Sequence, residues 1–337
     1  MSGNKPSLIL VRGGGDLATG VALRLHRARM KVVITELAQP LAVRRAVSFA
    51  EAVYEGQHTV EGVTARLVER DQLSAALEAD EIPILVDPDA DILLSSFLFL
   101  VVVDARLTKS PPHPLPTDIP LHIGLGPGFH AGRDCHAVIE TRRSHTLGRV
   151  FWSGTTQPDS GVPEGNPRRV LRAPNDGILT AKANIGDHVE EGQVIAEIQQ
   201  YVIPNEATLA PRSGREPAGA ERPGAHPPRE QVPGSAGENL GQSRRDSSPA
   251  AQSDMNIVSP FAGVLRGIIR DGIHVTKDMK IGDVDSRNDP SVCFFVSDKA
   301  LAIGGGVLEA ILSKEEIRRE LWTPSRPPPN TPRNKSR

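Results

Sequence analysis

Short apolar runs alternate with amphipathic segments along the first 150 residues. The run Leu8–Val11 precedes a glycine-rich turn. Leu17, Val21 and Leu25 then recur at a spacing that places them on one face of a helix, and a second apolar run covers residues 31–37. A strand, a turn, a helix and a second strand in this order predict a βαβ unit with parallel strands.

The same alternation continues further along the chain. The later predicted elements are strands at 62–68, 82–86, 97–103 and 121–123 and helices at 40–52 and 71–79. Strands that alternate with helices favour a parallel α/β sheet. We therefore expect a Rossmann-like parallel sheet domain over residues 1–150.

The pattern changes near residue 149, where short apolar runs are broken by tight turns and the helical period is lost. Residues 172–179 match residues 258–265, and residues 186–192 match residues 272–278 more loosely. We interpret these matches as an internal repeat. The sequence thus predicts an α/β domain followed by a small β-rich domain.

The two halves of the repeat are separated by residues 204–254, which are rich in Pro, Gly and Ser and contain no aromatic residue. Such a composition buries too little apolar surface to offset the entropy of ordering, so we predict a disordered insertion. Residues 324–337 are Pro-rich and basic, and we predict a disordered tail there. The β-rich domain is accordingly expected in two pieces, 165–203 and 255–312.

Composition narrows the classes of function. Lys and Arg number 39 against 41 Asp and Glu, so there is no positive excess to neutralise a nucleic-acid backbone. The two cysteines, Cys135 and Cys293, suit a reducing compartment. We expect no signal peptide at the start of the sequence, and its longest apolar stretch, 92–103, is too short to span a bilayer. We expect a cytoplasmic protein that binds neither nucleic acid nor membrane.

The glycine turn after the first strand is the leading candidate for a ligand site. Gly13, Gly15 and Ala18 fit the G-x-G-x-x-G/A pattern of dinucleotide-binding turns, in which backbone amides at a helix N-terminus meet a pyrophosphate. An acidic residue near the end of the next strand would bind a ribose hydroxyl. The ligand-binding residues predicted here are Gly13, Gly14, Gly15, Asp16 and Glu36. The alternative is a tight turn with Asp16 as a helix cap and Glu36 as a solvated strand end.

A second glycine-rich loop follows the strand at 121–123. Its predicted ligand contacts are Gly124, Gly126 and Gly128. His122, His130, Cys135 and His136 lie close by in the sequence, but their spacing matches no standard zinc motif, so we predict no metal site. The alternative is a structural loop with a buried cysteine.

Two further segments leave their role open. Residues 140–149 carry Arg, Ser and His side chains that suit an anion or a solvated junction. The cluster Gly304–Gly306 is either a third ligand loop or, as we prefer, a turn before a helix at 307–312.

The repeat resembles the biotinyl/lipoyl, or barrel-sandwich, fold. The segments that carry the likeness are 173–177, 186–192 and 259–263. In carriers of that fold a modified lysine lies in the hairpin between the halves, whereas residues 199–254 of this chain contain no lysine. The resemblance therefore implies the fold without biotin or lipoate.

The chain as a whole resembles the accessory proteins of the selenium-dependent molybdenum hydroxylase system. The motifs that carry this resemblance are 11–20, 44–54, 123–132, 137–141, 280–285 and 297–310. It implies a maturation factor whose partner is a molybdenum hydroxylase or its maturation machinery. The ligand stays unknown: our leading hypothesis is a nucleotide-bearing small molecule such as a molybdopterin-type dinucleotide, with NAD(P) as the other candidate. It transfers no catalytic residue, so these stay unknown and the enzyme question stays open. Residues 142–145 and 109–112 depart from the family pattern.

Two other functions fit the same residues. An NAD(P)-dependent oxidoreductase of small molecules would use Glu36 to favour NAD, because a carboxylate repels a 2′-phosphate. A ligand-free docking scaffold would use the β-rich domain to hold a hydroxylase.

Overall fold

The computed structural model describes residues 7–113, 115, 118–162, 165–199 and 255–322. The predicted insertion, 204–254, and the predicted tail, 324–337, lie outside the described residues.

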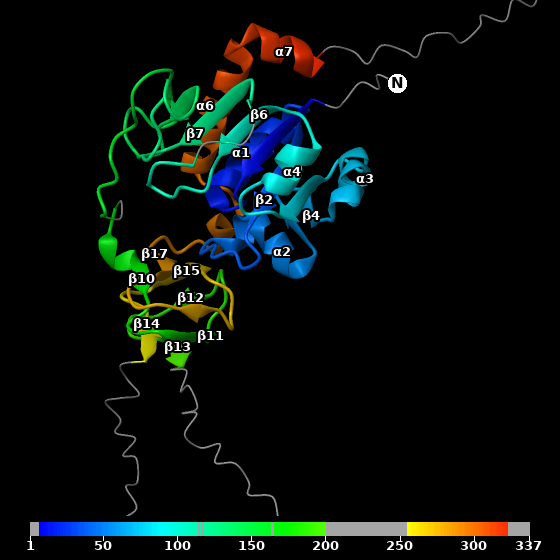
Figure 1. The fold of residues 1–337 in the computed structure, drawn as a ribbon. Helices are drawn as coiled ribbons and strands as arrows, with labels where there is room; N and C mark the ends of the chain where they lie inside the picture. Colours follow the sequence, from blue (N-terminus) through cyan, green and yellow to red (C-terminus); the bar gives the residue numbers. More distant parts are fainter. Residues whose placement is uncertain (1–6, 114, 116–117, 163–164, 200–254, 323–337) are drawn as a thin grey trace, which may run out of the picture.

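A nine-stranded sheet forms the larger part of the molecule (Figure 1). Its spatial order is β3-β4-β5-β2-β1-β6-β7-β8-β9. Neighbouring strands from β4 to β8 are parallel, and an antiparallel strand, β3 or β9, closes each edge. The strands are β1 (Leu8–Arg12), β2 (Lys31–Glu36), β3 (Gln57–Val60), β4 (Val63–Leu67), β5 (Ile82–Val86), β6 (Phe99–Asp104), β7 (Leu121–Leu125), β8 (Ala137–Ile139) and β9 (Val150–Phe151). The expected α/β class is confirmed.

Helices cover both faces of this sheet, because alternate residues of its strands, such as β1, present apolar side chains to opposite faces. Ile9 and Val11 face one apolar core with α1 and α6, whereas Leu8 and Leu10 face a second core with α3 and α4. A parallel strand buried on both faces reads as a continuous apolar run, as this one does. The helices are α1 (Asp16–Arg27), α2 (Ala52–Glu55), α3 (Leu73–Glu78), α4 (Asp91–Ser96), α6 (Asp298–Ser313) and α7 (Glu315–Trp322).

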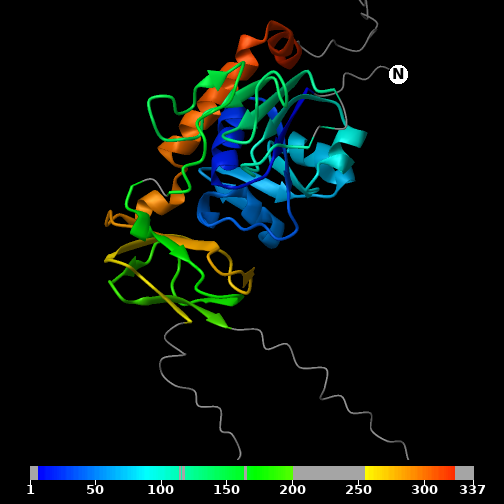
Figure 2. The same cartoon turned by 60° about the vertical axis from the view of Figure 1, so that its left-hand side comes forward.

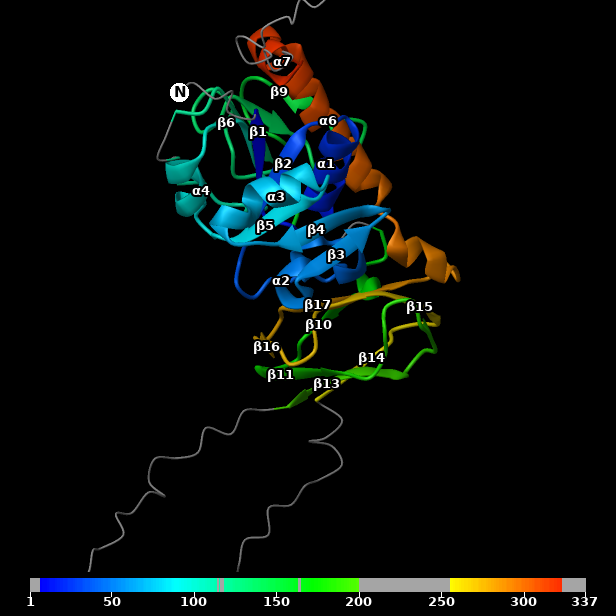
Figure 3. The ribbon, with the colours of Figure 1, turned by 90° about the vertical axis from the view of Figure 1, so that its right-hand side faces the viewer.

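The long helix α6 corrects two predictions. We placed residues up to 312 in the β-rich domain, but α6 returns to the large sheet and packs along α1 (Figure 3). Gly304–Gly306 is therefore neither a ligand loop nor a turn but part of a helix interior. A Cβ on Gly304 would lie 2.7 Å from Gly20 O, so close approach of the two helices explains this glycine.

By length and composition alone, one helical segment among the described residues, Pro290–Ser313, could cross a membrane. Core helices of soluble proteins pass the same test. In this chain Ala300, Ile303 and Val307 are completely buried against the large sheet unit.

The predicted helix at 40–52 is also wrong. Two short 3-10 turns, η1 (Arg45–Val47) and η2 (Phe49–Glu51), precede the one-turn α2. Ser48 between them has an extended backbone. Arg45 Nε donates to Ile268 O at 3.2 Å, and contacts of this kind with distant residues override a local helical preference.

The β-rich unit consists of two four-stranded antiparallel sheets around one apolar core (Figure 2). Their orders are β10-β17-β15-β12 and β14-β13-β11-β16. Each half of the repeat gives its short third strand to the other half's sheet, since β12 pairs with β15 and β16 pairs with β11. The strands are β10 (Val170–Arg172), β11 (Gly177–Ala181), β12 (His188–Val189), β13 (Val194–Gln199), β14 (Asn256–Val258), β15 (Gly263–Ile268), β16 (His274–Val275) and β17 (Lys280–Asp285).

Specific contacts join the β-rich unit to the large sheet unit. Arg270 forms ion pairs with Glu51 and Glu55 and lies over the ring of Tyr54, 4.8 Å from its centre. A Cβ on Gly267 would lie 2.7 Å from Val43 O, so the two backbones touch directly. These contacts hold β17 opposite the carboxyl ends of β1 and β2.

Candidate functional site

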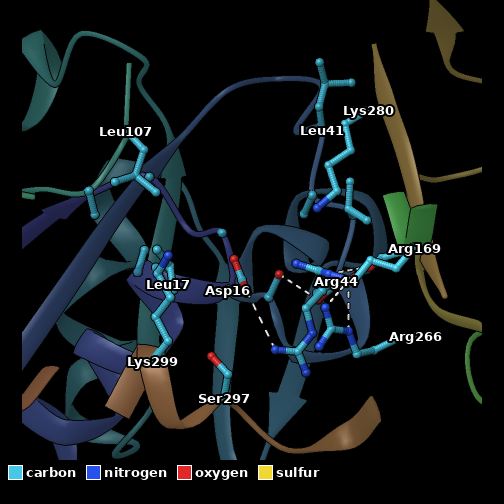
Figure 4. A pocket seen from close by; sticks show the side chains of 18 of the residues that line it. Asp16, Leu17, Leu41, Arg44, Leu107, Arg169, Arg266, Lys280, Ser297 and Lys299 are labelled. Atoms are coloured by element: carbon cyan, nitrogen blue, oxygen red, sulfur yellow. Dashed lines mark hydrogen bonds and ion pairs between the residues drawn. The ribbon is translucent and has the colours of Figure 1, made fainter. Parts of the chain in front are cut away.

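A cleft of about 960 Å³ lies between the carboxyl edge of the large sheet and the β-rich unit (Figure 4). The glycine turn and the first turn of α1 form one wall. Residues that follow β2, β5 and β6 continue this wall, and β17 with Arg266 forms the opposite one. Ser297, the N-cap of α6, and Lys299 in its first turn complete the lining.

The three glycines of the turn have different structural roles. Gly13 has φ +95°, and its N–H donates to Thr35 O at 2.8 Å, so this position requires glycine. A Cβ on Gly14 would lie 2.9 Å from Ala50 N. Gly15 has an ordinary φ of −63° and no atom within 4 Å of its Cβ position. Gly15 is thus the glycine whose missing side chain leaves space in the cleft.

The start of α1 faces this space without a side-chain cap. Gly15 occupies the N-cap position, and Asp16 is the first helical residue. The first amides of a helix carry a partial positive charge and suit an anion. The turn therefore has the geometry of a phosphate-binding helix N-terminus.

Glu36 lines the cleft but is engaged by the turn itself. Its carboxylate accepts hydrogen bonds from Gly14 N at 2.8 Å and Leu37 N at 2.6 Å. Burial raises the pKa of Glu36, and these two bonds lower it. The carboxylate therefore holds the glycine turn in place, and its role toward a ribose stays a prediction.

Asp16 contacts a buried cation. Arg44 Nη1 lies 3.7 Å from Asp16 Oδ2, and Arg44 Nη2 donates to Phe295 O at 3.0 Å. The Arg44 side chain is 9% exposed, and its Nε is a buried donor without a partner among the described residues. Burial lowers the pKa of Arg44, while Asp16 opposes that effect. Part of the guanidinium's hydrogen-bonding capacity is thus unused beside the cleft.

Cations outnumber anions on the cleft wall. Among the residues that line the cleft, eight are Arg or Lys and five are Asp or Glu. The cations are Arg44, Arg106, Arg143, Arg169, Arg266, Lys280, Arg287 and Lys299, and the anions are Asp16, Glu36, Asp89, Asp283 and Asp285. This balance favours an anionic ligand.

The β17 wall combines paired and unpaired charges. Asp283 is 1% exposed and binds both Arg169, at 2.5 Å, and Arg266. The side-chain ammonium of Lys280 has no hydrogen bond or ion pair in the part of the chain that the structure describes. The surrounding protein lowers the pKa of Lys280, chiefly by desolvation. Lys280 is therefore the cation most available to a ligand.

The second glycine loop does not reach this cleft. A Cβ on Gly124 would run into the ring of Phe129, and one on Gly126 would lie 2.5 Å from Thr141 Oγ1. Gly128 has φ +107° and approaches the backbone of Ser110. All three glycines are accounted for by packing, and none lines the cleft. Their role as ligand contacts stays a prediction.

Two of the residues near that loop, Cys135 and His122, are buried in neutral form. Cys135 Sγ donates to Ala137 O at 3.2 Å, and burial raises its pKa to about 11. Burial lowers the pKa of His122 to about 4, and His136 Nδ1 accepts a bond from the His122 amide. Across the described ranges, no three His, Cys, Asp or Glu residues are grouped so as to hold a metal ion.

Sequence reasoning missed the cations of the opposite wall. Arg266 and Lys280 stand in β strands whose spacing indicates only a turn-rich β domain. Neither residue lies in a local pattern that indicates a binding site, because the glycine turn and the start of α1 on the facing wall are more than 200 positions away in sequence.

Comparison with known proteins gives one relative and several distant structures. No family model matches the chain. The uncharacterized protein YqeB of Escherichia coli K12 is 41% identical over 311 residues, which are 90% of this chain, and the chain spans about half (47%) of that protein's length.

Two of the solved structures that resemble the chain share little sequence with it. An aspartoacylase family protein from Mesorhizobium loti is 12% identical, with a TM-score of 0.25 over 84% of this chain and 85% of that one. The ectoine utilization protein EutE (DoeB) from Ruegeria pomeroyi is 10% identical, with a TM-score of 0.22 over 83% and 85%. Similarities this weak support no conclusion about function.

Proposed function

We propose that this protein is a cytoplasmic accessory factor for selenium-dependent molybdenum hydroxylases. It binds a nucleotide-bearing ligand, such as the molybdenum cofactor in its dinucleotide form, in the 960 Å³ cleft. One observation carries the binding proposal: Gly15 opens the uncapped start of α1 to a cleft in which cations exceed anions. Backbone amides and guanidinium groups together are the groups that bind phosphate.

The topology supports this location. The chain passes from β1 to β2 on one side and later adds β6 on the other side of β1. In open parallel sheets ligands bind at such a reversal, beyond the carboxyl ends of the strands. We therefore regard the large unit as Rossmann-like. A volume of about 960 Å³ also falls near the upper end of the usual range for small-molecule sites.

We regard the β-rich unit as a barrel-sandwich-like platform without a prosthetic group. Its β17 closes the cleft with Lys280, Asp283 and Asp285. These side chains bind and orient charged groups. A binding factor that delivers its ligand to a molybdenum hydroxylase accounts for this wall.

The binding proposal can be tested with Gly15→Val. A Cβ at position 15 would have no protein atom within 4 Å, so the fold should persist with a loss of about 1 kcal/mol or less at the N-cap. The matched control is Gly305→Val, which is also unobstructed but lies in α6 away from the cleft.

Mass spectrometry of the small molecules released on denaturation should find a pterin dinucleotide in the wild type and in Gly305→Val, but not in Gly15→Val. Equal occupancy in all three proteins would contradict the assigned site. If NAD or NADP is released instead, the proposed accessory role is wrong and the protein is better described as an NAD(P)-dependent oxidoreductase.

A further inference from the structure

A second cavity, of about 340 Å³, adjoins the main cleft. The two cavities share five lining residues, which place them side by side. The shared residues are Leu17, Leu107, Arg169, Lys280 and Lys299. The space at the carboxyl edge of the large sheet therefore has two compartments with one junction.

The junction carries concentrated positive charge. Leu17 belongs to the first turn of α1, so the helix N-terminus lies at this point. Arg169, Lys280 and Lys299 bring three cations from the β-rich unit and α6, and Figure 4 shows all three around the cleft. Lys280 Nζ has no partner among the described residues. An anion at the junction would meet both the helix amides and this ammonium group.

The second compartment has a different lining. Pro127, Pro158 and Val162 supply apolar surface, and Val162 is 65% exposed. Arg142 is exposed there, and its side chain has no hydrogen bond or ion pair within the described part of the chain. Lys109 is paired with Asp159 at 2.7 Å. A mixed apolar and cationic wall suits an organic group that carries its own polar substituents.

We propose that the two cavities form one bipartite site for a pyrophosphate-linked dinucleotide. The linking phosphates lie at the junction, beside Lys280 and the first turn of α1, and the two organic halves occupy the two compartments. This inference rests on the proposed function and specifies the shape of its ligand. It also gives the β-rich unit a direct part in binding, since Lys280 and Arg169 both come from it.

Three probes and three variants test the inference. The probes are the dinucleotide form of the molybdenum cofactor freshly released from a purified hydroxylase, NAD⁺ and inorganic pyrophosphate. Lys280→Ala removes the junction cation, and Val162→Trp fills the second compartment from an exposed position. Lys277→Ala, an exposed lysine of the β-rich unit that lines neither cavity, is the control.

Lys280→Ala should weaken binding of every probe that the wild type binds by about tenfold, because charged hydrogen bonds are lost. Val162→Trp should weaken a dinucleotide by a similar factor and leave pyrophosphate unchanged. Lys277→Ala should match the wild type. Thermal melts of all three variants should match that of the wild type.

The outcomes separate this inference from the proposed function. If Gly15→Val abolishes binding while Lys280→Ala and Val162→Trp do not weaken it, the bipartite site is wrong and the proposed cleft stands. If Val162→Trp weakens the binding of pyrophosphate as much as the binding of a dinucleotide, the two compartments are not separate and the inference is wrong. Binding of NAD⁺ alone supports the bipartite site and replaces the proposed cofactor. If the wild type binds none of the probes, both proposals are overturned.

Discussion

Because α6 packs closely on α1, we expect alanine to have different effects on stability at two adjacent glycines of α6. A Cβ on Gly304 would lie 2.7 Å from Gly20 O and 2.9 Å from Arg24 Cγ. Gly20 O belongs to the backbone of a buried helix, so it cannot move aside without shifting α1. A Cβ on Gly305, one residue further, would meet nothing within 4 Å.

The magnitude follows from two opposing effects. Alanine is better than glycine inside a helix by about 1 kcal/mol, and both substitutions gain this amount. Overpacking a well-filled contact costs about 1–3 kcal/mol, and only Gly304→Ala incurs this cost. Gly305→Ala should therefore raise the free energy of unfolding by about 1 kcal/mol. The free energy of unfolding of Gly304→Ala should be about 1–3 kcal/mol lower than that of Gly305→Ala. The gain in helix propensity is the same in both variants, so it does not contribute to this difference.

The assay is urea unfolding of both variants and the wild type, followed by far-UV circular dichroism. Equal slopes against urea concentration would show that the variants differ in stability and not in the surface exposed on unfolding. Equal midpoints for the two variants would refute the packing of α6 on α1 described above.

Three further measurements test the buried groups. Since the pKa of Cys135 is raised to about 11, its alkylation by iodoacetamide at pH 8 should be about 100-fold slower in the native protein than in urea; equal rates by peptide mapping would contradict its burial. The pKa of His122 is lowered to about 4, so the unfolded chain binds more protons between pH 6.5 and 4 and stability should fall as pH falls through that window, by about 3 kcal/mol. The variant His122→Leu should lose less stability over the same range, and an unchanged pH dependence would refute the assignment. Asp104→Asn breaks a buried pair with Arg12 and should cost about 3 kcal/mol in urea unfolding, whereas Asp159→Asn, in an exposed pair, should cost less than about 1 kcal/mol; similar costs would show that the first pair is not buried.

Local signals predicted the βαβ unit and its glycine turn correctly in position. The apolar run of β1, the glycines after it and the helical spacing of α1 are all neighbours in sequence, so the pattern is sufficient to place them. The function of each glycine could not be predicted in this way. Gly14 is needed because Ala50, 36 positions later, packs against it, whereas Gly15 faces open space.

Long-range packing explains the predictions that failed. The apolar residues of α6 have a helical spacing, but the three glycines Gly304–Gly306 suggest a break unless the partner helix is known. Lys280 has no sequence neighbour that marks it as part of a site. Lys280 lines the cleft because β17 faces the start of α1. That arrangement depends on contacts between the two units, such as the ion pair of Arg270 with Glu51.

The packing of α6 on the large sheet unit also determines the order in which parts of the protein can fold during synthesis. Chains are synthesised at about 5–20 residues per second, and domains generally fold as units. A chain that has not yet reached Asp298 leaves Ala18, Val21 and Leu25 of α1 without the helix that packs on them. The wall formed by β17, Ser297 and the α6 residue Lys299 is synthesised equally late. On the ribosome, the cleft between the two units is therefore among the last parts of this protein to form.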